Sequence, residues 1–214
     1  MTTRLCLIRH GETDWNAEGR LQGAIDIPLN ALGVRQAQAA ARSLREQSFD
    51  ALYCSDLQRA RMTAEIIGDA LHLPARIDAR WRERHLGLLQ GLTREEANAR
   101  FPDAYGTLKA RRPDYLPPEG EAIDALLARV EAVLAQIARE HAGQNVIVVS
   151  HGGVLDIAYR LVMGIPYNLV RSWRLNNAAL NWLEHDGQAW RLIAWDDSSH
   201  LQTTQQAARD EQSA

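Results

Sequence analysis

Two short apolar runs, each followed at once by a histidine and a glycine, constrain the fold of this chain most. LCLI at residues 5–8 leads into RHG, and VIVV at residues 146–149 leads into SHGG. Runs of this length without polar side chains are typical of parallel strands that are buried on both faces. Such strands predict an α/β protein in which helices cover both faces of the sheet.

Helical and strand patterns alternate along the rest of the chain. Their order predicts a three-layer α/β/α sandwich with a mostly parallel sheet and one antiparallel edge element. Ser55 or Asp56 is expected to cap the second helix, because both residue types accept hydrogen bonds from helix N-termini. The expected helices span residues 32–47, 57–70, 122–141 and 152–163, and further strands are expected at 49–54, 77–81 and, as a hairpin, 179–184 and 189–195.

The stretch at residues 87–118 has a looser pattern, with prolines at 102, 113, 117 and 118. Thr93 followed by Glu96 has the spacing of a capping box and predicts a helix start. We expect a small helical insertion that covers the active site. The chain of 214 residues is otherwise consistent with a single domain over residues 1–200 and a polar tail over 201–214.

Composition excludes several classes of protein. The formal net charge of −3 argues against broad nucleic-acid binding, which needs a basic face. Cys6 and Cys54 are too few for a disulfide framework or a zinc ribbon. No apolar run approaches the ~20 residues that span a bilayer, and the first residues show no signal peptide. We therefore expect a cytoplasmic protein without a membrane partner.

Lysine is almost absent. Of the 24 Lys and Arg residues, only Lys109 is a lysine. A phosphate loop of the Walker type needs a lysine directly after its glycines, so this chain does not carry one. Any phosphate must be bound by arginine, whose guanidinium group donates two parallel hydrogen bonds.

Candidate functional residues directly follow the predicted strands. In open α/β sheets, ligands bind beyond the carboxyl ends of the strands. Arg9 and His10 follow the first strand, His151 follows the strand at 146–149, and Arg59 lies in the first turn of the second helix. A single histidine at a strand end is usually a satisfied polar residue. Two imidazoles with two arginines instead indicate an anion pocket, and no carboxylate or cysteine cluster accompanies them to indicate a metal.

Four ordered motifs resemble the histidine phosphatase superfamily, in its phosphoglycerate mutase-like branch. The match covers residues 5 to about 155, with spacing similar to that of the family. A lone Arg-His-Gly would be a weak signal, whereas four motifs in order are specific. The motifs are LIRHGETDWN at 7–16, SDLQRA at 55–60 with TA at 63–64, ERHLG at 83–87 with QGL at 90–92, and VSHGG at 149–153.

The resemblance implies a role for each of five residues. His10 would be the nucleophile that forms a phosphohistidine. Arg9, Arg59 and His151 would hold the phosphoryl oxygens and stabilise the charge that develops on them. Glu83 would act first as general acid toward the leaving group and then as general base toward water. Further candidates for binding phosphate or substrate are Asn16, Gln22, Gly23, Gly152, Thr13, Arg111 and Arg112.

The resemblance implies a histidine acid phosphatase-type phosphomonoesterase that hydrolyses a small phosphorylated metabolite, without a metal or other cofactor. The alternative is a phosphoglycerate mutase of the 2,3-bisphosphoglycerate-dependent type, in which paired arginines such as Arg111 and Arg112 meet the substrate carboxylate. The stretch PPEGE at 117–121, followed by Arg129, resembles the family's broad phosphatase branch, in which the usual run is Pro-Gly-Gly-Glu-Ser. This chain has Glu119 for a glycine and Ala122 for the serine, which weakens the assignment to that branch. A further alternative function is the non-catalytic binding of phosphorylated ligands. A homodimer is a separate alternative to a monomer.

Overall fold

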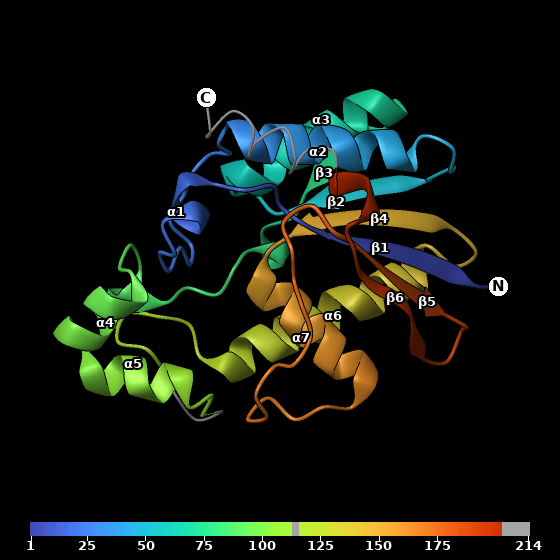
Figure 1. The fold of residues 1–214 in the computed structure, drawn as a ribbon. Coiled ribbons are helices and arrows are strands. Elements are labelled where there is room, and N and C mark those ends of the chain that lie inside the picture. Colours follow the sequence, from blue (N-terminus) through green and yellow to red (C-terminus); the bar gives the residue numbers. More distant parts are fainter. Residues whose placement is uncertain (113–115, 203–214) are drawn as a thin grey trace.

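A six-stranded sheet forms the centre of the computed structural model, which describes residues 1–112 and 116–202 (Figure 1). The strand order is β3-β2-β4-β1-β5-β6. The first four strands in this order are parallel, and the hairpin at the other edge is antiparallel. The strands are β1 (Thr3–Arg9), β2 (Ala51–Cys54), β3 (Ala75–Ile77), β4 (Asn145–Ser150), β5 (Leu180–His185) and β6 (Trp190–Asp197).

Helices cover both faces of this sheet (Figure 1). Successive side chains of β1 point to opposite faces, so Cys6 and Ile8 join one core and Leu5 and Leu7 join the other. Burial on both faces explains why the strand is apolar at all four positions, and the predicted three-layer sandwich is confirmed. One face carries α2 (Ala31–Leu44) and α3 (Gln58–Leu71), and the other carries α6 (Ile123–Glu140) and α7 (Gly152–Met163).

The strand predicted at residues 77–81 is wrong. The strand β3 ends at Ile77, and Ala79–Trp81 forms a short 3-10 helix. The Asp78 carboxylate causes this turn, because it accepts a hydrogen bond of 2.9 Å from the backbone N–H of Arg80. The turn directs Trp81 into the core, where the residue is 1% exposed.

The cap of α3 also differs from the prediction. Its N-cap is Leu57, without a side-chain cap. Ser55 Oγ instead accepts from the backbone N–H of Leu57 at 3.2 Å. The first free N–H of the helix, at Gln58, is satisfied by Asp26 Oδ1 at 2.6 Å, and Asp56 pairs with Arg82. The cap therefore comes from a loop distant in sequence.

The expected insertion has a small core of its own. It holds η2 (Gly87–Leu89), α4 (Arg94–Arg100) and α5 (Pro102–Lys109), with the predicted capping box of Thr93 and Glu96 at the start of α4. Leu89, Leu92 and Ala97 form its buried centre. An isolated antiparallel bridge joins it to the segment after the short helix α1 (Asp14–Ala17). Residues 113–115 of this stretch lie outside the described residues.

The carboxyl-terminal part is ordered beyond residue 200. Ser199–Leu201 forms a 3-10 helix, and Leu201 is 1% exposed in the core on the α2 side. The remaining tail, residues 203–214, lies outside the described residues. Within residues 1–112 and 116–202, no helix is long and apolar enough to cross a membrane.

The loop after β1 contacts the start of α2 backbone to backbone. A Cβ atom at Gly33 would lie 2.1 Å from the carbonyl oxygen of Glu12, and one at Gly11 would lie 2.4 Å from the carbonyl oxygen of Gly33. Both neighbours are backbone atoms and cannot rotate away. Two glycines are therefore needed for α2 to pack against the loop that follows the first strand.

We predict that Gly33→Ala lowers the free energy of unfolding by about 1–3 kcal/mol, because the added methyl group forces the loop and helix apart. Gly106→Ala is the matched control. A Cβ at Gly106, in the exposed α5, meets nothing within 4 Å. This control should gain up to ~1 kcal/mol, since alanine favours helix more than glycine does. Urea denaturation of both variants checks this, and an unchanged midpoint for Gly33→Ala would contradict it.

Candidate active site

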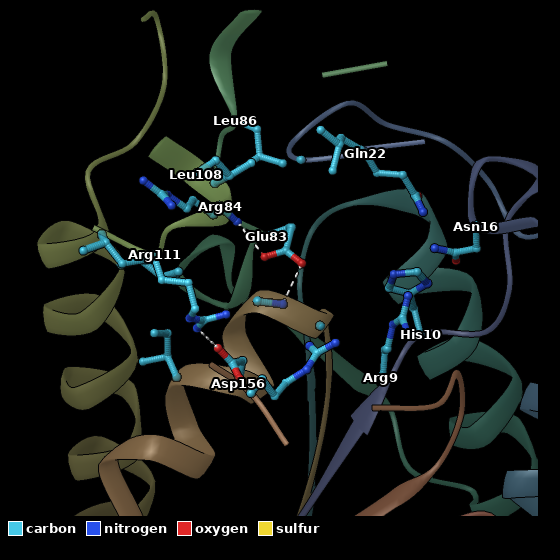
Figure 2. Close-up of a pocket in the computed structure, with 18 of the residues that line it drawn as sticks. Arg9, His10, Asn16, Gln22, Glu83, Arg84, Leu86, Leu108, Arg111 and Asp156 are labelled. Atoms are coloured by element: carbon cyan, nitrogen blue, oxygen red, sulfur yellow. Dashed lines mark hydrogen bonds and ion pairs between the residues drawn. The ribbon is translucent and has the colours of Figure 1, made fainter. Parts of the chain in front are cut away.

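A cavity of about 290 Å³ lies beyond the carboxyl ends of β1 and β4 (Figure 2). Arg9 stands opposite Ser150 in the parallel pairing of the two strands. The residues that follow them, His10 and His151, consequently lie side by side with ring centroids 5.2 Å apart. Of the predicted site residues, the cavity is lined by Arg9, His10, Asn16, Gln22, Gly23, Arg59, Glu83, Arg111 and Gly152.

His10 is buried and held in one tautomer. Its Nδ1 lies 2.7 Å from the carbonyl oxygen of Gly11, and because a carbonyl only accepts, Nδ1 carries the hydrogen. The lone pair of the neutral ring is then on Nε2. Burial lowers the pKa of His10 well below its ordinary value, and the positive charges of Arg59 and Arg9 lower it further. The ring is therefore neutral at pH 7, with a nucleophilic nitrogen.

His151 has the opposite tautomer. It is fully buried beside His10, and its Nδ1 accepts a hydrogen bond of 3.2 Å from Arg59 Nε. Burial and the neighbouring Arg59 hold its pKa well below the ordinary value, so the neutral ring carries its hydrogen on Nε2. That Nε2 has no hydrogen-bond partner among the described residues. His151 thus offers a donor where His10 offers a lone pair.

Two buried arginines supply the positive charge. Arg9 Nη1 donates to the carbonyl oxygen of Leu175 at 2.6 Å, whereas its Nε has no partner among the described residues. Arg59 donates from Nη1 to the carbonyl oxygen of Ile25 and from Nη2 to the carbonyl oxygen of Gly23, both at 2.7 Å. Burial lowers the pKa of Arg59 to about 10, so the group stays protonated at neutral pH. Both guanidinium groups are fixed by carbonyls before any ligand arrives.

Asn16 and Gln22 form the wall opposite Glu83 (Figure 2). Asn16 Oδ1 accepts from the backbone N–H of Thr13 and from Asn177 Nδ2, both at 3.2 Å, which leaves its amide NH₂ group for the cavity. Gln22 Oε1 is buried without a partner among the described residues. Thr13 does not line the cavity. It caps α1 in a capping box with Asn16, so its contact with the site is through Asn16.

Glu83 projects into the cavity between the sheet edge and the helical insertion (Figure 2). Its Oε1 accepts from the backbone N–H of Arg84, and its Oε2 accepts from the backbone N–H of Gly153, both at 2.8 Å. A Cβ at Gly153 would lie 2.2 Å from Glu83 Oε1. The glycine therefore gives the carboxylate room to approach the first turn of α7.

The arginines beside Glu83 in the sequence are bound elsewhere. Arg80 pairs with Asp78, and Arg82 pairs with Asp56. Arg129, an arginine of α6, fixes the backbone that directly precedes Glu83. Its Nη1 donates to the carbonyl oxygens of residues 80 and 82 at 2.6 and 2.8 Å, and its other nitrogens bind the carboxylate of Glu121. The position of Glu83 thus depends on hydrogen bonds from α6, a helix that covers one face of the sheet.

The two arginines proposed to meet a substrate carboxylate separate in the structure. Arg111 lines the cavity, where its Nη2 pairs with Asp156 and its Nε donates to the carbonyl oxygen of Tyr167 at 2.9 Å. Arg112 is exposed and does not line the cavity. Arg111 has a positive φ of 53°, so the chain turns sharply between the two side chains. The structure therefore brings only Arg111 to the site.

Three residues that support the site were not among the predicted site residues. Asn177 Nδ2 donates to the carbonyl oxygen of His10 at 2.9 Å, and Thr63 Oγ1 accepts from the N–H of Gly11 at 3.0 Å. Asp156 lines the cavity one helical turn after Gly152. Thr63 belongs to the second arginine motif, SDLQRA with TA. Asp156 could have been found from Gly152 and Gly153, since residues three or four positions apart on a helix share a face. Asn177 had no such signal.

This arrangement can bind a phosphoryl group and transfer it. A neutral imidazole with a free lone pair lies beside two guanidinium groups and a second imidazole that donates. A carboxyl group, Glu83, lies at the other side of the cavity, where a proton can be given or taken. Among the described residues, no three His, Cys, Asp or Glu side chains gather closely enough to hold a metal ion.

Comparisons with known proteins identify the family of this chain. The model of the histidine phosphatase superfamily (branch 1) matches residues 5–198. A metal-independent phosphoserine phosphatase of Arabidopsis thaliana is 41% identical over 202 residues, which are 93% of this chain and 83% of the relative. A probable phosphoglycerate mutase, GpmB, of Yersinia pestis (strain Pestoides F) is 37% identical over 205 residues, 91% of this chain and 93% of that protein.

Solved structures show the same architecture. YhfR of Bacillus stearothermophilus superposes with a TM-score of 0.88 at 32% identity, covering 94% of this chain and 100% of that one. A mycobacterial glucosyl-3-phosphoglycerate phosphatase superposes with a TM-score of 0.81 at 31% identity, covering 92% and 100%. From its motifs, its fold and these relatives, the chain belongs to branch 1 of the histidine phosphatase superfamily.

Proposed function

We propose that this protein is a phosphomonoesterase of the histidine acid phosphatase type, which hydrolyses a small phosphorylated metabolite through a phosphohistidine on His10. One observation carries the proposal. The free lone pair of His10 lies among two donors that have no partner among the described residues, Arg9 Nε and His151 Nε2. A buried donor without a partner is costly, so these groups suit an anionic ligand that accepts from them.

In the first half-reaction, His10 Nε2 attacks phosphorus and the bond from phosphorus to the ester oxygen breaks. The phosphoryl oxygens accept hydrogen bonds from Arg9, Arg59 and His151. These bonds stabilise the negative charge on the oxygens in the transition state. The positive charge that develops on the His10 ring is stabilised by the carbonyl oxygen of Gly11, which accepts from Nδ1. Protonated Glu83 gives its proton to the departing alcohol.

In the second half-reaction, water attacks the phosphorus of the phosphohistidine. Glu83, now a carboxylate, takes the proton of that water as its oxygen bonds to phosphorus. The bond from phosphorus to nitrogen breaks, and its electron pair returns to His10 Nε2. Inorganic phosphate leaves, and both residues are restored. Asn16, Gln22 and the backbone of Gly23 and Gly152 serve as further phosphate-binding groups.

Relatives support hydrolysis as the fate of the phosphoenzyme. The first relatives in sequence and structure include proteins named as phosphatases. Others are named as phosphoglycerate mutases or mutase-like proteins, which keeps transfer to a second hydroxyl as the competing function. Both functions share the phosphohistidine and differ in what attacks it.

His10→Asn should lower the hydrolysis of p-nitrophenyl phosphate at least ~10³-fold, because the nucleophilic ring nitrogen is lost. Rapid quenching with ³²P-labelled substrate should trap an acid-labile, alkali-stable phosphoenzyme in the wild type and none in the variant. His72→Asn is the control, since His72 is exposed in a left-handed position that asparagine accepts. Full activity of His10→Asn would overturn the proposal.

The products formed from 3-phosphoglycerate test the mutase alternative. Wild-type enzyme incubated with 3-phosphoglycerate should release inorganic phosphate if water attacks the phosphohistidine. Formation of 2-phosphoglycerate at a rate above that of phosphate release would identify the mutase instead. Product analysis by ³¹P NMR separates the two.

Glu83→Gln should slow esters of poor leaving groups more than esters of good ones, because only an alkoxide of high pKa needs a proton as it departs. The expected loss in kcat/KM is ~10²–10⁴-fold for an alkyl phosphate and much smaller for p-nitrophenyl phosphate. Comparing kcat/KM for both substrates measures this, because kcat/KM does not include the later hydrolysis of the phosphoenzyme, in which Glu83 acts as the base. Equal losses would remove Glu83 from the role of general acid.

The buried histidines should make stability depend on pH. Their folded-state pKa values lie below the unfolded value, so below pH ~6.5 the unfolded chain binds protons that the folded protein does not. The free energy of unfolding should therefore decrease as the pH is lowered below ~6.5, by at most about 1.4 kcal/mol per pH unit for each histidine. Urea denaturation at pH 7.5 and 5.5 measures this. A double variant, His10→Asn with His151→Asn, should show a smaller decrease, and an unchanged decrease would contradict the assignment.

A further inference from the structure

Asp156 is a buried carboxylate in the wall of the cavity with one oxygen left unsatisfied. It is 5% exposed and lines the cavity together with Arg111. Its Oδ2 accepts from two arginines, Arg111 Nη2 and Arg160 Nε, the latter at 3.1 Å. Its Oδ1 has no hydrogen-bond partner among the described residues. A buried carboxylate oxygen without a donor is unfavourable, so this atom suits a group that the protein does not supply.

The surroundings of Asp156 are fixed, so the atom cannot turn to find another donor. Arg160 is buried and donates from Nη1 to the carbonyl oxygen of Pro166 and from Nη2 to that of Leu169. Arg111 is held by the carbonyl oxygen of Tyr167 and stacks on its ring with the guanidinium carbon 4.3 Å from the ring centroid. Two immobilised cations therefore hold Oδ2 and leave Oδ1 as the free acceptor.

Asp156 lies on the side of the cavity where the leaving group must be. It follows Gly153 by three positions on α7, and the N–H of Gly153 holds Glu83, the proposed proton donor to the departing alcohol. Figure 2 shows Asp156 and Arg111 on the other side of Glu83 from Asn16. A phosphoryl group at His10 with its ester oxygen toward Glu83 directs the rest of the substrate to Asp156.

We propose that Asp156 Oδ1 accepts a hydrogen bond from the alcohol part of the substrate, so that the natural substrate is a phosphate ester whose alcohol carries a hydroxyl or ammonium group close to the ester oxygen. This inference rests on the proposed function. Among the described residues, six arginines and two carboxylates line the cavity, so an additional acidic group on the substrate is also accommodated. Asp156 Oδ1 thereby favours an alcohol that carries a donor over an alcohol of the same size that carries none.

Three compounds of equal length test the proposal: O-phospho-L-serine, 3-phospho-D-glycerate and 3-phosphooxypropionate. They bear an ammonium group, a hydroxyl group or a hydrogen on the carbon next to the carboxylate. The first two have opposite configurations at that carbon, so O-phospho-D-serine and 3-phospho-L-glycerate are measured beside them. Each is used as a competitor of p-nitrophenyl phosphate hydrolysis, which measures its affinity whether or not it is turned over. At least one of the first two should bind about tenfold or more tighter than 3-phosphooxypropionate, and the better one identifies the donor. Equal affinities of all three would overturn the proposal.

Asp156→Asn gives a second test. Arg111 and Arg160 only donate, so the amide oxygen of the variant stays with them and its NH₂ group takes the place of Oδ1. The preference for the donor-bearing compound over 3-phosphooxypropionate should then fall about tenfold or more. Asp124→Asn, the same change at an exposed position on α6 outside the cavity, should keep the wild-type preference. A preference unchanged in Asp156→Asn would overturn the role of Oδ1.

Failure of the proposed function has a different signature. The wild type would then not hydrolyse p-nitrophenyl phosphate at all. Calorimetric titration of the wild type with the same three compounds would still measure the preference for a donor, independently of turnover.

Discussion

The parallel pairing of β1 with β4 is the constraint on which the rest of the site depends. With Arg9 opposite Ser150, the two strands end at the same level, and the histidine after each strand is placed in the same buried space. A slip of one residue would turn one strand's side chains to the wrong face and separate the rings. Nucleophile and donor are therefore set by the core of the sheet rather than by a flexible loop.

Burial then determines the protonation states. Removing water disfavours the charged form of both imidazoles, and two arginines that remain charged disfavour it further. Each ring has one nitrogen engaged, His10 by a carbonyl and His151 by Arg59, and these opposite partners produce opposite tautomers. Because the guanidinium groups are held by backbone carbonyls, the positive field is in place before phosphate enters, and little reorganisation accompanies reaction.

Local sequence patterns predicted the layers of the fold because buried strands and amphipathic helices carry their periodicity with them. They failed where a side chain decides the backbone structure. Asp78 ended a predicted strand by binding the backbone two residues further on. Asp26, which is distant in the sequence, supplied the cap expected from Ser55 or Asp56. The motifs located the strand-end residues of the site. Supporting contacts such as that of Asn177 with His10 join positions far apart in the chain, and no local pattern encodes them.

The helical insertion has a separate core and meets the rest of the molecule through the segment after α1 and the cavity wall. Leu108 of the insertion and Leu86 just before it line the cavity on the side proposed for the alcohol. The groups proposed to react lie after β1 and β4, in the first turn of α3 and in the segment of Glu83. Mutations in this unit can change which alcohol fits without disturbing the two-histidine centre or the main cores. Such a division allows selectivity to change while the centre stays the same, and the names of two similar structures, a glucosyl-3-phosphoglycerate phosphatase and an alpha-ribazole phosphatase, are in line with it.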